Sequence, residues 1–283
     1  VITNLARAAE WYQKAADQEH AAALNALAYL NNYGLGMTEN RRRAFQLYQR
    51  AAELGNGPAM LEMGRIYDFA KGVDRDYAKA AEWYKKAADL DIAEAKSNLG
   101  FLYEYGYGVE RDTRHATLLF REAASADDAQ GLYWMGRRYE YGDQVTQDLG
   151  QAANYYNKAA AKNYGSAMIQ LAFMYRDGRG FAKDEVRAFE LFRQAADMRF
   201  SAAQREYGWL TFLGRGTIKN VSAAIKSIED AAGQGDTLAQ IYLGYIFETE
   251  RSVYDPKRAA AHYVEGLKKG EAYPATRKTS AWD

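Results

Sequence analysis

The stretch from Ala93 to Asp128, AEAKSNLGFLYEYGYGVERDTRHATLLFREAASADD, decides the fold because the rest of the chain repeats it. Three glycines that hold the same place in successive copies, Gly64, Gly100 and Gly136, lie 36 residues apart. A fixed period of about 20–50 residues is typical of a solenoid built from one small structural unit. The sequence therefore predicts a single repeat array, although 283 residues would also suffice for two globular domains.

Each 36-residue unit reads as two helices joined by a turn. In the first half, small and apolar residues such as Ala59, Met63 and Ile66 recur at helical spacing, which predicts an amphipathic helix. The second half carries a small-plus-aromatic pattern at the same spacing, as at Trp83 and Tyr84. Because no strand pattern is present, we predict an all-α protein made of αα-repeats.

The turn inside each unit has two signals that fix its position. A glycine pair such as Gly106 and Gly108 follows the first helix, where glycine adopts the left-handed conformation at little steric cost. An Asp or Asn then stands where the second helix needs an N-cap. The predicted caps are Asn40, Asp76, Asp112, Asp148, Asp184 and Asn220, with Asp255 before Pro256 in the last unit.

The units keep a constant register over most of the chain. Residues 1–20 match only the second half of a unit and are expected to form a capping helix; residues 21–272 form seven units, and residues 273–283 are a cap or tail. The chain starts at Val1 rather than at methionine, which is compatible with removal of a signal peptide or an upstream region. The seven units start at Ala21, Gly57, Ala93, Ala129, Gly165, Ser201 and Thr237.

A family resemblance appears in these strings. The pattern L-G-x-x-Y-x-x-G-x-G-V-x-x-D-x-x-x-A, from Leu99 to Ala116, and the W-Y-x-K-A-A string from Trp83 to Ala88 resemble the Sel1-like repeat (SLR), a relative of the tetratricopeptide repeat. The resemblance implies a right-handed αα-superhelical solenoid whose first helices line a concave groove. It also implies a non-enzymatic scaffold or adaptor in bacterial envelope signalling, effector neutralisation or host interaction, in a periplasmic or secreted setting.

Composition narrows the possible partners. The 37 basic and 37 acidic residues balance, so no overall field directs the protein to nucleic acid, and no nucleic-acid partner is predicted. The absence of cysteine removes disulfides, thiolate chemistry and cysteine-bound metals. No apolar run approaches the roughly 20 residues that span a bilayer, so we predict no direct membrane insertion. Composition leaves the oligomeric state open.

Sequence motifs for catalysis are missing. The chain has no GxxxxGK[ST] loop, no HExxH and no GxSxG. The three histidines, His20, His115 and His262, lie in different repeats at different repeat positions, so we predict neither a metal nor another cofactor. We therefore predict that the protein is not an enzyme; a hydrolase would need a compact pocket with perturbed carboxylates.

The first helix of each unit carries the candidate binding residues. Its second, fifth, ninth, twelfth and thirteenth positions lie beside the core stripe and should face the groove. Aromatic and arginine side chains supply much of the binding energy at protein interfaces, and they are frequent there. The predicted residues for a protein or peptide partner are Tyr29, Tyr33, Arg65, Phe69, Phe101, Tyr105, Tyr133, Arg137, Tyr141, Phe173, Arg176 and Trp209.

Some of these residues are expected to pair. Residues four apart share a helix face, so Arg65 with Phe69 and Arg137 with Tyr141 are predicted to form cation–π contacts. The alternative is that these rings pack against the preceding repeat. At the twelfth position, Phe212 is expected to lie outside the core.

Two further expectations concern function. Within the quoted stretch, Ser97, Phe101 and Glu104 stand between the stacking residues, and we expect them, with Tyr105, to carry any specific function. A carbohydrate-binding or polysaccharide-export module is the alternative to a protein scaffold. Exposed rings can stack on sugars, and Trp209 with Tyr245 would be the place to look.

Overall fold

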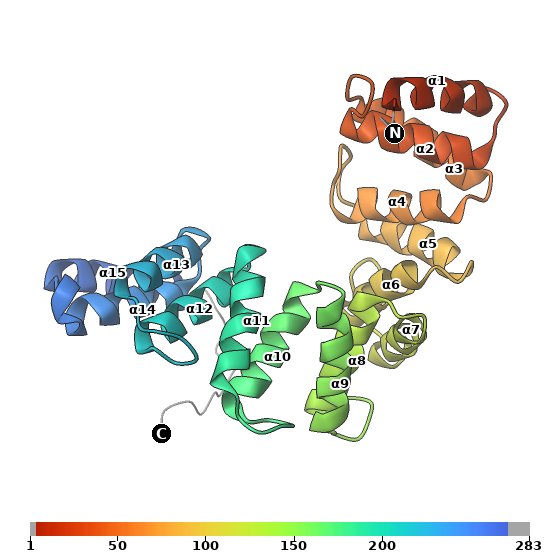
Figure 1. Cartoon of the computed structure of the whole chain (residues 1–283). Coiled ribbons are helices and arrows are strands. Elements are labelled where there is room, and N and C mark those ends of the chain that lie inside the picture. Colours follow the sequence, from red (N-terminus) through yellow and green to blue (C-terminus); the bar gives the residue numbers. More distant parts are fainter. Residues whose placement is uncertain (1–3, 271–283) are drawn as a thin grey trace. The chain divides into compact units, whose positions relative to one another are not determined.

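The computed structural model describes residues 4–270, in which every regular element is a helix (Figure 1). The helices form two compact units, one containing α1 to α8 and the other α9 to α15. The boundary between the units follows Asp148 and falls inside the fourth repeat. Helices that are consecutive in sequence contact one another within each unit, as expected for an α-solenoid.

The first unit contains one half repeat followed by three complete repeats and the first helix of the fourth. Its helices are α1 (Leu5–Ala16), α2 (Ala21–Tyr33), α3 (Arg41–Glu53), α4 (Gly57–Asp68), α5 (Tyr77–Ala88), α6 (Ala93–Tyr105), α7 (Thr113–Ser125) and α8 (Ala129–Tyr141).

The second unit continues the same pattern. Its helices are α9 (Leu149–Ala161), α10 (Gly165–Asp177), α11 (Glu185–Asp197), α12 (Ser201–Leu213), α13 (Val221–Gly233), α14 (Thr237–Thr249) and α15 (Pro256–Gly270), with a short 3₁₀ helix at Arg251–Val253. The tail predicted at residues 273–283 lies outside the described residues.

The predicted helix starts are confirmed. All seven first helices begin at the predicted first residue of their unit. In the second helices, the side chains of Asn40, Asp76, Asp112, Asp184 and Asn220 accept hydrogen bonds from backbone N–H groups in the first turn. In the last repeat, the backbone N–H groups of Lys257 and Arg258 donate to Asp255 Oδ1 at 3.0 Å each, as the shifted cap predicted.

The turn inside the repeat keeps its backbone conformation even where glycine is absent. Gly34, Gly106 and Gly178 end their helices in the left-handed conformation. Ala70 and Gln144 replace a glycine of the pair, yet they keep positive φ values of 54° and 62°. The turn therefore keeps its backbone conformation without glycine, and the two residues adopt a conformation that non-glycine residues normally avoid.

A second left-handed position lies in the turn between repeats, and we did not predict it from the sequence. It recurs every 36 residues, with φ between 58° and 87°, at Glu19, Gly55, Asp91, Asp127, Asn163, Arg199 and Gly235. Five of these seven residues are glycine, aspartate or asparagine, the types that adopt this conformation most readily, so residue type was an available signal.

The core explains why a small residue recurs in each first helix. A Cβ atom added to Gly64 would lie 2.4 Å from the ring of Tyr84, and one added to Gly100 would lie 2.8 Å from Phe120. Both rings are fully buried. The second helix thus packs its ring directly on the backbone of the first helix, as the glycine spacing predicted. The Tyr84 hydroxyl also donates to Asp68 Oδ2 at 3.1 Å, which fixes the pair of helices.

Candidate functional site

Five of the predicted binding residues are exposed, and all five lie in the first unit. Four of them lie in α2, α6 and α8, and Phe69 is the C-cap residue of α4; between 46% and 59% of their surface is accessible. We call these residues the aromatic stripe: Tyr29, Tyr33, Phe69, Tyr105 and Tyr141. Four of them stand at the thirteenth position of consecutive first helices. The stripe is therefore a set of large apolar side chains at a regular interval, open to a partner.

The other seven predicted residues are half-buried, and several contact neighbouring side chains. They are Arg65, Phe101, Tyr133, Arg137, Phe173, Arg176 and Trp209. Arg65 forms ion pairs with Glu62 of the same helix and with Glu94 of α6. The cation that lies over Phe69 is the Lys71 ammonium, 5.5 Å from the ring centroid. The expected contact between Arg65 and Phe69 is thus replaced by a salt bridge between repeats.

Phe101 belongs to an aromatic cluster rather than to the open surface. Its ring centroid lies 4.8 Å from that of Tyr105 and 6.2 Å from that of Trp134 on the next first helix. Tyr107 stacks on Tyr77 at 5.0 Å and on Tyr105 at 5.6 Å. These contacts hold Tyr105 in place at the centre of the aromatic stripe.

Tyr107 and Trp134 were missed by the sequence reasoning, which treated the glycine pair only as a turn. A signal was available, because the residue between the two glycines is tyrosine in this repeat alone. Tyr107 is 40% exposed and so extends the apolar surface beside Tyr105.

Arg137 makes the predicted cation–π contact. Its guanidinium carbon lies 5.7 Å from the ring centroid of Tyr141 and 4.9 Å from that of Trp134. Tyr133 is half-buried with its ring edge-on to Trp134 at 5.7 Å, and burial raises the pKa of its hydroxyl. Arg137 therefore lies at one end of the aromatic stripe, held over two rings.

In the second unit, the predicted residues pack against their neighbours. Phe173 meets Phe192 edge-on at 5.0 Å, and the Arg176 guanidinium lies 4.7 Å from the Phe173 ring centroid. Arg176 also forms ion pairs with Asp177 at 2.7 Å and with Glu206 at 2.9 Å. Its charge is thus largely satisfied within the unit.

The expectation that Phe212 lies outside the core is wrong, because its side chain is buried. Trp209 packs on Phe212 at 5.4 Å and on Tyr242 of α14 at 4.5 Å. Tyr245 meets the indole at 5.6 Å. Contacts with three rings leave less of the Trp209 surface for a sugar, which disfavours the carbohydrate alternative.

Two of the intervening residues in the quoted stretch have structural roles. Ser97 is fully buried, and its hydroxyl donates to Asp128 Oδ2 at 2.5 Å, where Asp128 caps α8. The expectation that Ser97 contacts a partner is therefore wrong. Glu104 turns inward and pairs with Arg138, whose side chain is buried.

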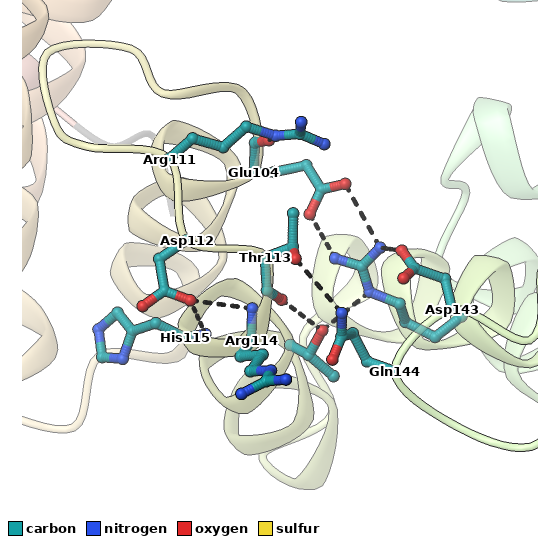
Figure 2. A network of polar contacts seen from close by, with 10 residues as sticks. Glu104, Arg111, Asp112, Thr113, Arg114, His115, Asp143 and Gln144 are labelled. Atoms are coloured by element: carbon teal, nitrogen blue, oxygen red, sulfur yellow. Dashed lines mark hydrogen bonds and ion pairs between the residues drawn. The ribbon is translucent and has the colours of Figure 1, made fainter.

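The Arg138 cluster is the second feature that the sequence reasoning missed. Arg138 stands at a position where the other six repeats carry Leu, Ile or Met. Its Nε donates to Thr117 Oγ1 at 2.9 Å, and its guanidinium also pairs with Asp143. Figure 2 shows Glu104 and Asp143 directed towards one guanidinium group from two sides. The available signal was a charged residue at a repeat position that is otherwise aliphatic or methionine.

The histidines have ordinary packing roles. His20 Nδ1 accepts from the Ala23 backbone N–H at 3.3 Å, and His115 meets the Tyr103 ring edge-on at 4.6 Å. His262 stacks on Phe247 at 5.5 Å, and burial lowers its pKa. Within residues 4–270, no group of three or more potential ligands could hold a metal ion. In the same range, no helix is long and apolar enough to cross a membrane.

The repeated pairs of helices and the close glycine contacts define the class of protein, an α-solenoid of short helix-turn-helix repeats. The Sel1 repeat family matches the chain over residues 1–20, 21–56, 57–92, 93–128, 129–164, 165–200, 201–235 and 237–270, so the chain belongs to this family. Sel1 repeat proteins are generally non-catalytic scaffolds for protein interaction.

Two solved structures are similar over most of the chain. One is an SLR-fold protein described as a protective antigen present in uropathogenic Escherichia coli strains, with 31% identity and a TM-score of 0.73 over 93% of this chain. This chain spans 57% of that protein's length. The other is a Sel1 repeat protein from Oxalobacter formigenes, with 29% identity and a TM-score of 0.72, covering 88% of this chain and 100% of that one. No curated protein sequence matches the chain.

Proposed function

We propose that this protein is a scaffold that holds a protein or peptide segment against the aromatic stripe of the first unit. The observation that carries the proposal is the recurrence of half-exposed rings at one repeat position on four consecutive first helices. Aromatic anchors supply a large share of the binding energy at interfaces. A packed array presents them in fixed positions, so little ordering cost arises on this side of the complex.

The alternative that the rings only stabilise the fold explains some residues but not the stripe. Packing accounts for Phe101, which is half-buried among other rings. It does not account for Phe69 and Tyr141, which remain 57% and 59% exposed. Isolated exposed apolar residues need no explanation, but a regular row of them favours an interaction surface.

The biological setting is a further part of the proposal. The family resemblance suggests envelope signalling, effector neutralisation or host interaction. Of these, we favour host interaction by an exported protein, because the E. coli relative is described as a protective antigen.

Site-specific photo-crosslinking tests where the partner lies. A photoreactive phenylalanine analogue would replace Phe69 or Tyr141, and the matched control would carry it at Leu118 of α7, which is 51% exposed on a second helix. In cells of the source organism, the two stripe positions should trap the same protein while Leu118 does not. Crosslinks only from Leu118, or specific binding to glycans and to no protein, would overturn the proposal.

The trapped protein then allows a quantitative test. Each of Tyr33→Ser, Phe69→Ser and Tyr141→Ser should weaken its binding by about threefold to thirtyfold, which corresponds to about 0.7–2 kcal/mol for exposed anchor residues. Leu118→Ser should leave the affinity unchanged. Far-ultraviolet circular dichroism should show equal helical content in all variants, because none of these side chains is part of the core.

A further inference from the structure

A cleft of about 430 Å³ lies in the first unit beside the aromatic stripe. Residues of α1, α2, α3 and α4 line it, and the stripe residue Tyr29 is one of them. Tyr12 and Tyr48 add two more rings, Asn25 and Glu62 add polar groups, and the rest of the wall is aliphatic. A cavity of about 150 Å³ already binds benzene. The cleft is therefore large enough for a long side chain from a partner.

Three polar side chains at this cleft have hydrogen-bonding capacity that no described residue uses. The Asn25 Oδ1 atom is shielded from solvent and makes no hydrogen bond. Tyr48 is only 3% exposed, and no described residue forms a hydrogen bond with its hydroxyl. Glu62 accepts from Arg65 through Oε1, and no described residue donates to its Oε2. Buried polar groups in folded proteins are almost always paired, and among the described residues Asn25 Oδ1 is the buried side-chain atom that lacks a partner. The Tyr48 hydroxyl and Glu62 Oε2 are not enclosed in this way, and both can accept a hydrogen bond from a group in the cleft.

The charges around the cleft favour a cation. Among the described residues, no Lys, Arg or His side chain lines it, whereas the carboxylate of Glu62 does. Nearby, Glu62 and Glu94 share a single guanidinium, that of Arg65, so one negative charge is left over. Burial and then the charge of Glu62 raise the pKa of the Tyr48 hydroxyl. An anionic group would therefore be repelled here.

We propose that this cleft receives an arginine side chain of the partner. The inference rests on the proposed function, since it names the chemistry of one anchor of the same partner. A guanidinium group offers five N–H donors and no acceptor, which complements a cleft with unpaired acceptors. It also stacks on aromatic faces, here those of Tyr12 and Tyr29, and its hydrocarbon stem suits an aliphatic wall.

Titration of the whole chain with small blocked amino acids tests this assignment. The probe is N-acetyl-arginine amide, and its neutral counterpart is N-acetyl-citrulline amide, which has nearly the same shape. Backbone amide signals of α1, α2 and α4 in two-dimensional NMR spectra should shift saturably with arginine. Citrulline should bind at least about fivefold more weakly. Equal binding of the two, or tighter binding of blocked leucine or tryptophan, would overturn the proposal.

The chain offers a matched pair of carboxylate variants. Glu62→Gln removes the charge at the cleft and should reduce the affinity for the arginine probe to that of citrulline. Glu94→Gln removes the other carboxylate that pairs with Arg65 but does not line the cleft, so it should leave the affinity within twofold. An equal loss in both variants would show that only Arg65 is being disturbed, and it would overturn the assignment.

The outcome is separate from that of the scaffold proposal. Crosslinking at Phe69 and Tyr141 does not depend on this cleft. If a partner is trapped there while arginine and citrulline bind equally, only the arginine assignment fails. If no partner is trapped, the scaffold proposal fails whatever the probe does.

Discussion

Replacing Arg138 with methionine is expected to destabilise the first unit by about 3–5 kcal/mol. Methionine itself suits the position, because the equivalent residue in the fifth repeat is Met174. The loss instead comes from Glu104, which would keep a buried carboxylate without its cation. Breaking one half of a buried ion pair costs far more than the net worth of the intact pair.

The geometry shows which contact dominates this loss. The side chains of Arg138 and Glu104 are 4% and 12% exposed, and they meet through a two-point contact that includes Nη1 and Oε1 at 3.3 Å. Asp143 is 46% exposed, so its pairing contributes at most about 1 kcal/mol. Thr117 loses a donor but still donates its own hydroxyl to the Thr113 carbonyl at 2.8 Å, so its contribution is small.

Hydrogen–deuterium exchange at increasing urea concentration measures this effect locally. Long repeat arrays need not unfold in one step, so a global transition would mix the two units. The amides of α6, α7 and α8 report on the packing around Arg138, and α13 and α14 in the second unit serve as the internal control. The free energy of opening should fall in the first set only.

A double variant decides whether the reasoning is right. Arg138→Met together with Glu104→Leu replaces the pair by apolar groups and should return the opening free energy to within about 1 kcal/mol of the parent. The two substitutions would then be strongly coupled, by about 2–4 kcal/mol. A double variant as unstable as the sum of its single variants would refute the claim that an orphaned carboxylate causes the loss.

Three further predictions concern the repeat framework. Arg199→Gly should stabilise the second unit by about 0.5–1 kcal/mol in urea unfolding, because Arg199 has φ of 65° in a position where glycine is unstrained. Gly64→Ala should destabilise the first unit by about 1–3 kcal/mol in the same assay, because the new Cβ would lie 2.4 Å from the Tyr84 ring. In an NMR pH titration, Asp76 should show a pKa below the ordinary 3.8, held down by hydrogen bonds from the Lys79 backbone and ammonium. Its stabilising effect should be complete near neutral pH and be lost as the pH falls through that lowered pKa.

The fold could be predicted from sequence because its main constraints are local to one repeat. The contact between Gly64 and Tyr84 needs a residue without a side chain at one position and a ring 20 residues later, and both recur visibly. The turn between repeats gave a weaker sign. Its left-handed position is Gly, Asp or Asn in five of seven occurrences, which suits this conformation, but it is Glu19 and Arg199 in the other two.

The candidate site was harder to predict because it depends on pairs of residues in different repeats. Arg65 forms an ion pair with Glu94 of the next repeat. Phe101 is half-buried because its ring packs against Trp134, which also lies in the next repeat. Glu94 and Trp134 do not recur at the equivalent positions of the other repeats. A prediction made from the repeat pattern alone therefore places Arg65 and Phe101 on an exposed surface. Arg138, by contrast, could have been recognised from the sequence, because the equivalent residue in every other repeat is Leu, Ile or Met.

The distribution of the rings also argues for where recognition takes place. The thirteenth position of the first helix is aromatic at Tyr33, Phe69, Tyr105 and Tyr141, and then becomes Asp177, Leu213 and Thr249. The change coincides with the boundary between the two compact units after Asp148. Beyond it, arginines at neighbouring positions are used internally, because Arg176 pairs with Glu206, and Arg205 pairs with Glu206 and Asp236. Since every repeat needs the same stacking residues, a feature present in only one unit is not required by the fold. This distribution supports the proposal that the partner's anchors lie on the first unit.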